Sequence, residues 1–148
     1  MASWAEFEQA EPALASRVRA LLESRKHLTM ATLRQDGSPR ISGTEIQIVD
    51  GRLQIGSMPG AVKALDLMRD PRVAIHGPTT DPPEERPAGW VGEAKVAGVA
   101  RQEDSGDTSH RFVIDITEVV ITRLNEAGDR LVIESWHPAR GYRVRDRE

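Results

Sequence analysis

The sequence predicts a mainly β protein, in which six or seven antiparallel strands curl into a barrel beside an N-terminal helix and one short inserted helix. From residue 27 onward, apolar residues alternate with period two, which is typical of strands. The pairs Asp36-Gly37 and Asp50-Gly51 are hairpin signals. Short turns imply antiparallel pairing, and closure into a barrel removes exposed sheet edges.

Composition narrows the class of protein. With 148 residues, the chain is expected to form one domain, residues 1–148, with its own core. It has no long apolar run, no signal-peptide pattern and no cysteine, so we expect a cytoplasmic protein without membrane spans or disulfides. The net charge of −3 disfavours nucleic-acid binding. The four histidines are scattered without ligand spacing, so no metal site is expected.

Residues 1–26 are predicted to be a helical segment. Ser3 and Glu6 have the spacing of a capping box, in which each side chain satisfies a backbone donor of the other residue. Pro12 is suited to the first position of a helix. The apolar residues that follow share one helix face, which predicts a helix over about 12–25: Leu14, Val18, Leu21 and Leu22.

The first strands carry a change of parity. Ile41 is odd-numbered, whereas Ile46 and Ile48 are even-numbered. Because a slip of one residue moves every side chain to the other face, this pattern predicts a bulge at Gly43. Bulges often lie beside functional sites, but a plain kink in a curling sheet is an equally good interpretation.

The middle of the chain alternates strands with one helix. After the hairpin at Asp50-Gly51, Leu53 and Ile55 continue the sheet. A helix of about 60–69 follows, and Pro71 ends it because the residue before proline disfavours helix. The next strand contains Val73 and Ile75, and a proline-rich loop covers 77–89.

The last third is predicted to be three more strands and a tail. The strands cover 90–101, 111–124 and 130–136, and residues 137–148 form a highly charged tail. If the tail is extended, Arg143, Arg145 and Arg147 project to one side, toward an anionic ligand or a neighbouring subunit. A solvated, frayed end is the alternative.

One pair of basic residues is placed to hold a phosphate. Lys63, one of only three lysines beside seventeen arginines, lies near the start of the predicted helix 60–69, where backbone donors and the helix dipole favour anions. Arg40 follows a hairpin and offers a planar fork to phosphate oxygens. The alternative is that both are solvated surface residues. Neither a Rossmann nor a P-loop pattern occurs, so a nucleotide would bind to the barrel surface.

The order and spacing of these motifs resemble the pyridoxamine 5'-phosphate oxidase-like split-barrel family. The resemblance covers about residues 10–124 and includes the segments from Asp36 to Arg40, Asp50 to Leu53, Gly56-Ser57, Lys63 and Asp70 to Val73. It implies a six-stranded antiparallel Greek-key split barrel and a homodimer. It also implies a flavin-type cofactor in a groove between the subunits, either FMN or the deazaflavin coenzyme F-420.

The resemblance further implies the residues of the site. Arg40, Gly56, Ser57 and Lys63 would contact the phosphate and the ring edge. Ile41, Ser42, Gly43 and the backbone at Met58 would face the ring, and the partner subunit would close the site with Trp136 and Arg140. The oxidase's second basic residue is replaced by Val62, which argues against vitamin B6 oxidation.

Two functions follow from the resemblance. The first is an oxidoreductase that acts on a small molecule with FMN or deazaflavin, and the arginine-rich composition resembles the deazaflavin-dependent branch. In that case the arginines after residue 139 would hold the anionic tail of coenzyme F-420. The second is a non-catalytic binding or carrier protein for a flavin, haem or another tetrapyrrole.

Overall fold

The computed structural model describes residues 1–147, so the last residue of the predicted tail lies outside the described residues. Within these described residues, three α-helices, a short 3-10 helix and nine strands follow one another. In order they are α1 Trp4–Ala10, α2 Pro12–Leu22, β1 Leu28–Leu33, β2 Pro39–Thr44, β3 Ile46–Val49, β4 Arg52–Ser57, α3 Val62–Arg69, β5 Arg72–His76, η1 Pro87–Gly89, β6 Glu93–Glu103, β7 His110–Leu124, β8 Leu131–His137 and β9 Gly141–Arg147.

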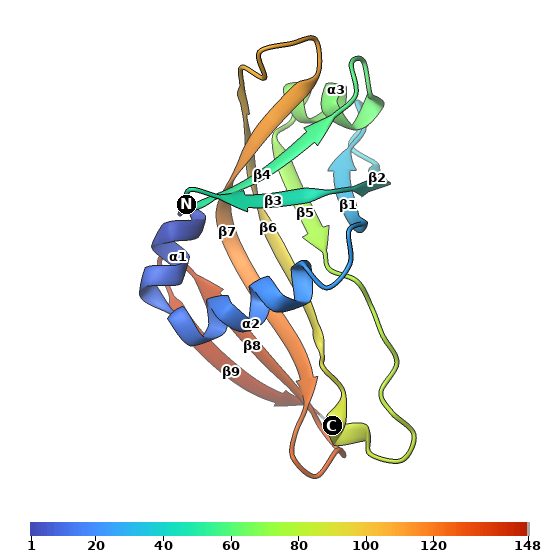
Figure 1. The fold of residues 1–148 in the computed structure, drawn as a ribbon, viewed down its shortest axis with the longest axis vertical. Helices are drawn as coiled ribbons and strands as arrows, with labels where there is room; N and C mark the ends of the chain where they lie inside the picture. Colours follow the sequence, from blue (N-terminus) through green and yellow to red (C-terminus); the bar gives the residue numbers. More distant parts are fainter. Residues whose placement is uncertain (148) are drawn as a thin grey trace.

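The N-terminal segment forms two helices where one was predicted. Ser3 caps α1, because its Oγ accepts a hydrogen bond from the backbone N–H of Glu6 at 3.1 Å, which is one half of the predicted capping box; the Glu6 carboxylate accepts from the Ser3 hydroxyl at 3.3 Å. Pro12 opens α2, which ends at Leu22 and not at residue 25. Leu14, Val18 and Leu22 are buried, so this face of α2 covers the sheet (Figure 1).

All pairings in the sheet are antiparallel, and its path runs β2-β1-β5-β6-β7-β4-β3. The long strand β7 organises the sheet. β6 pairs with one edge of β7, while β4 and β8 pair with residues 110–114 and 119–124 of it, respectively. The mainly β split-barrel prediction is therefore confirmed, with more strands among residues 1–147 than the six expected.

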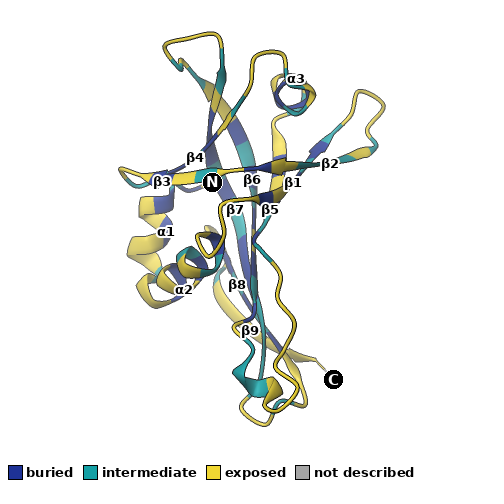
Figure 2. Ribbon diagram, turned by 45° about the vertical axis from the view of Figure 1, so that its right-hand side comes forward, coloured by how far each residue is buried: buried dark blue, intermediate teal, exposed yellow. Residues whose placement is uncertain are grey.

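One hydrophobic core connects the helices with the sheet. Trp4 and Phe7 of α1 meet edge to face, with ring centroids 5.3 Å apart, and Phe7 also packs on Trp136 of β8 at 4.9 Å. Burial is concentrated along the middle of the sheet, whereas β9 and the segment between β5 and β6 are exposed (Figure 2). None of the described helices is long and apolar enough to cross a membrane.

The bulge predicted at Gly43 is wrong. β2 pairs with β1 in unbroken register from Pro39 to Thr44, and the even-numbered Thr44 is buried in the same parity as Ile48. The buried residues of β2 and β3 have even numbers throughout. Ile41 is exposed although it is apolar, so its odd number does not indicate a change of face. The register instead shifts between Ala97 and Gly98 of β6. At Gly98 a Cβ would lie 2.3 Å from a backbone oxygen of β7, so only glycine fits there.

The charged tail is a strand. β9 pairs with β8 along its length, so the frayed-end interpretation is wrong for residues 141–147. Tyr142 of β9 donates to the buried carboxylate of Glu134, which also accepts from Arg17 of α2 and Arg123 of β7. The hydrogen bond from Arg17 lowers the pKa of Glu134 to about 2 against the opposing effect of burial. This cluster fastens β9 to the rest of the fold.

Candidate functional site

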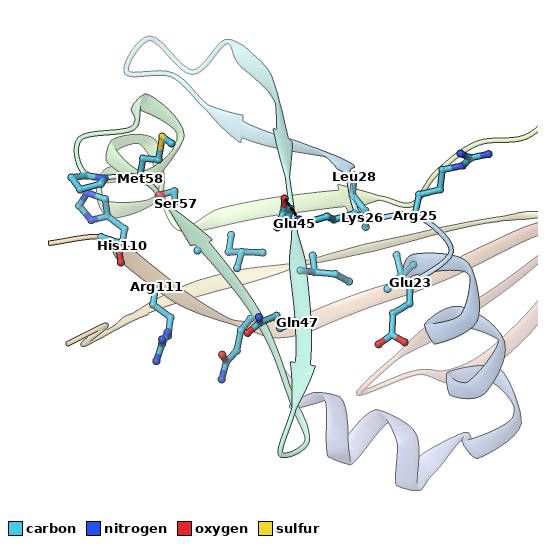
Figure 3. Close-up of a pocket in the computed structure, with 17 residues that line it drawn as sticks. Glu23, Arg25, Lys26, Leu28, Glu45, Gln47, Ser57, Met58, His110 and Arg111 are labelled. Carbon is cyan, nitrogen blue, oxygen red and sulfur yellow. Dashed lines mark ion pairs between the residues drawn. The ribbon is translucent and has the colours of Figure 1, made fainter. Parts of the chain in front are cut away.

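A large cavity opens between the end of α2, β3, β4 and the start of β7. Its volume is about 720 Å³, within the range of roughly 300–1,000 Å³ typical of small-molecule sites. Ser57, Met58 and His110 lie at one end of it, and Arg25 and Lys26 at the other (Figure 3). Gln47 and Gln54, paired across β3 and β4, line it between these ends.

The predicted phosphate residues Ser57 and Lys63 meet beside this cavity. Gly56 and Ser57 line both the cavity and a narrow crevice that also contains Lys63. Lys63 is in the first turn of α3, and no side chain caps that helix, so its first backbone N–H groups are open to an anion. The Lys63 ammonium donates to the carbonyl of Gly43 at 2.7 Å, which brings β2 to the same place.

The Oγ of Ser57 is buried and has no hydrogen-bond partner among residues 1–147. A buried hydroxyl without a partner costs about 1–3 kcal/mol. A ligand oxygen that binds beside Lys63 would supply that partner. The lysine, the helix start and the unpaired hydroxyl therefore fit the phosphate of a flavin-type cofactor.

Arg40 is placed differently from the prediction. Its Nε donates at 2.7 Å to Asp66 of α3, a carboxylate that is only 2% exposed and also accepts from Thr32 and Arg69. Burial alone raises the pKa of Asp66, but these hydrogen bonds outweigh it and lower the pKa to about 2. Arg40 also lines a separate hollow of about 410 Å³, so its charge is already paired away from the main cavity.

The neighbours of Arg40 in β2 divide between two faces. Ile41 is 74% exposed and lines a third hollow on the outer face of the sheet, together with Ala31 and Ala74. Ser42 lies on the opposite face by strand alternation. The carbonyl of Gly43 accepts a hydrogen bond from Lys63, and Thr44 at the end of the same strand lines the Lys63 crevice.

Trp136 and Arg140 lie away from this site in the same chain. Trp136 is 5% exposed and packs in the core against Phe7. It pairs with Val119 of β7, nine residues beyond the His110 that pairs with Ser57, which corresponds to roughly 30 Å along a strand. Arg140 lies in the exposed turn between β8 and β9 and lines neither the cavity nor the crevice.

The site residues predicted from the sequence did not include His110, Arg111 or Asp66. His110 is opposite Ser57 in the register of β4 and β7, so its role depends on a pairing between residues far apart in the chain. Asp66 is the only acidic residue of α3, and the other residues of that helix are apolar or basic. This contrast is the feature of the sequence that could have indicated a special role for Asp66. Within residues 1–147, no group of three histidine, aspartate or glutamate side chains is arranged to hold a metal ion.

Solved structures share this fold at low sequence identity. PhzG from Burkholderia lata, determined with tetrahydrophenazine-1-carboxylic acid, matches with a TM-score of 0.67 and 8% identity over 97% of this chain and 92% of that one. A pyridoxamine 5'-phosphate oxidase-related, FMN-binding protein from Nostoc punctiforme matches with a TM-score of 0.64 and 11% identity over 93% of this chain and 96% of that one. A heme-binding protein from Mycobacterium smegmatis matches with a TM-score of 0.57 and 14% identity over 93% of this chain and 88% of that one.

Among curated proteins, none matches this sequence. The model of the pyridoxamine 5'-phosphate oxidase family matches residues 14–135, which include every strand of the barrel from β1 to β7. The fold and this match agree with the split barrel that the motifs predicted. The chain therefore belongs to the pyridoxamine 5'-phosphate oxidase family of split-barrel proteins.

Proposed function

We propose that the protein is an oxidoreductase that binds FMN or the deazaflavin coenzyme F-420 in the 720 Å³ cavity, with the phosphate beside Lys63. The observation that carries the proposal is the unpaired Ser57 hydroxyl buried next to Lys63 at the start of α3. The FMN-binding relative from Nostoc punctiforme supports this choice of cofactor.

When bound, either cofactor supplies the redox chemistry, since it accepts and returns a hydride. The chain supplies binding and orientation. Lys63 and the N-terminus of α3 neutralise the phosphate, Ser57 fixes one of its oxygens, and Gln47 and Gln54 offer amides to polar ring atoms. We assign no catalytic residue in this chain.

We propose a homodimer as the functional form. Large apolar side chains are exposed on β2, on the segment before α3 and on α3 itself: Ile41, Met58, Val62 and Leu65. Large exposed apolar areas often mark a surface that another protein covers, and we propose a second copy of this chain as that cover. Sedimentation at micromolar concentration should give about twice the 16.4 kDa chain mass, and a species of 16.4 kDa alone would contradict the dimer.

The test of function compares ligands directly. Purified protein is titrated with FMN, coenzyme F-420 and haem, each bound cofactor is reduced with an added reductant, and hydride or electron transfer to candidate acceptors is followed. We expect FMN or F-420 to bind and to support turnover. Binding of haem alone, or flavin binding without transfer to any acceptor, would favour the carrier function.

A further inference from the structure

His110 is held by a hydrogen bond that defines which ring nitrogen carries its proton. The backbone N–H of Gly60, in the turn before α3, lies 3.1 Å from Nε2 of His110. A backbone N–H only donates, so Nε2 must be the acceptor. In the neutral imidazole the proton therefore lies on Nδ1, an assignment that follows from the hydrogen bond and not from observed hydrogens.

That Nδ1–H group has nothing to bind within residues 1–147. Nδ1 of His110 is buried without a hydrogen-bond partner, as is the Oγ of Ser57. The two residues are directly opposite each other in the β4–β7 pairing, so their Cβ atoms are about 4.5–5.5 Å apart. Both line the cavity, at the end where Ser57 also borders the Lys63 crevice (Figure 3).

We infer that His110 is a binding residue for the ligand's phosphate, to which its neutral Nδ1–H donates a hydrogen bond. This inference rests on the proposed function. Ser57, Lys63 and His110 then form a set of three different donors, namely a hydroxyl, an ammonium and a ring N–H, for phosphate oxygens. The same set serves a phosphate monoester, as in FMN, and a phosphodiester, as in coenzyme F-420. The protein should therefore discriminate against riboflavin, which lacks the phosphate.

Two substitutions distinguish the roles of the two ring nitrogens of His110. His110→Gln keeps an acceptor near the Nε2 position for Gly60 but removes the Nδ1–H donor. His110→Asn keeps a donor near the Nδ1 position but removes the acceptor. We expect His110→Gln to weaken FMN binding about tenfold and His110→Asn to weaken it less than about threefold. The exposed His27→Gln is the matched control and should change nothing.

Fluorescence titrations with FMN and riboflavin measure these effects. The inference requires that His110→Gln leave riboflavin affinity unchanged, so that the loss belongs to the phosphate. An equal loss for both flavins would overturn it. So would a normal FMN affinity in His110→Gln combined with a loss in His110→Asn, because His110 would then only hold the turn at Gly60.

The tautomer is measured without any cofactor, by ¹⁵N NMR of the histidine rings about two pH units above the ordinary histidine pKa. We expect the proton of His110 on Nδ1. His137, whose Nε2 lies 2.7 Å from Glu118, is the internal control and should carry its proton on Nε2. A proton on Nε2 of His110 would refute the donor assignment even if FMN binds, whereas failure of FMN and F-420 to bind wild-type protein would refute the proposed function instead.

Discussion

Replacing Lys63 by methionine should weaken FMN binding about tenfold. Methionine keeps an unbranched apolar side chain and removes the ammonium. In the free protein this ammonium donates to the carbonyl of Gly43 at 2.7 Å, and because an ammonium has three donors it can keep this bond while it binds a phosphate. A hydrogen bond to a charged group contributes about 1.5–3 kcal/mol, and the lower end of this range corresponds to about tenfold in Kd.

The assay is a fluorescence titration of wild-type protein and variant with FMN and with riboflavin. Riboflavin affinity should stay the same, because the lost contact is to the phosphate. Lys95→Met is the matched control, since Lys95 is an exposed lysine of β6 that lines neither the cavity nor the crevice. Equal losses for both flavins, or the same loss in Lys95→Met, would refute the phosphate site.

Three further predictions concern stability. The pKa values of Asp66 and Glu134 are lowered to about 2, so both carboxylates stabilise the fold fully above their unfolded pKa values near 4 and lose this effect as the pH falls toward 2. Urea unfolding should therefore give a smaller free energy of unfolding at pH 3 than at pH 7. Asp66→Asn should make this difference between the two pH values smaller. Tyr142→Phe should lower the free energy of unfolding by about 1 kcal/mol, because it removes one donor to Glu134, and unchanged stability would mean that β9 is held by pairing alone. Gly98→Ala should lower the free energy of unfolding by more than about 1 kcal/mol, measured by thermal unfolding, because a Cβ there would clash with β7. Gly43→Ala is the control, since nothing lies within 4 Å of a Cβ there, and it should change that free energy by less than about 0.5 kcal/mol.

Local chemistry made much of the fold predictable. Asp50 and Gly51 adopt φ angles of 53° and 71°, the conformation that their type of hairpin turn requires, and β3 and β4 pair on either side of them. The helix predicted over about 60–69 is α3, which ends before Pro71 as expected and has Lys63 in its first turn. Signals of this kind act over a few residues, so the sequence contains them directly.

Long-range pairing explains what the sequence analysis missed. His110 becomes a site residue only because β7 places it opposite Ser57, more than fifty positions earlier in the chain. β9 looked like a solvated end because its charged residues face water, yet its backbone pairs with β8. Arg40 looked free because the buried Asp66 that binds it lies in another element.

The arginines of β9 are tested for contact with the anionic tail of coenzyme F-420 by substitution and not by deletion. Because Tyr142 of the same strand donates to Glu134, a deletion of the strand would also disturb the fold. Single replacements such as Arg143→Gln and Arg145→Gln, whose side chains are exposed, are the cleaner experiment.

The most direct test of the flavin site is chemical-shift mapping of ¹⁵N-labelled protein during titration with FMN. We predict that the largest amide shifts occur at Ser57, Gly60, Lys63 and His110, around the unpaired hydroxyl and the start of α3. Largest shifts in the separate hollow beside Arg40, or no saturable shifts with FMN or coenzyme F-420, would contradict a flavin phosphate bound beside Lys63.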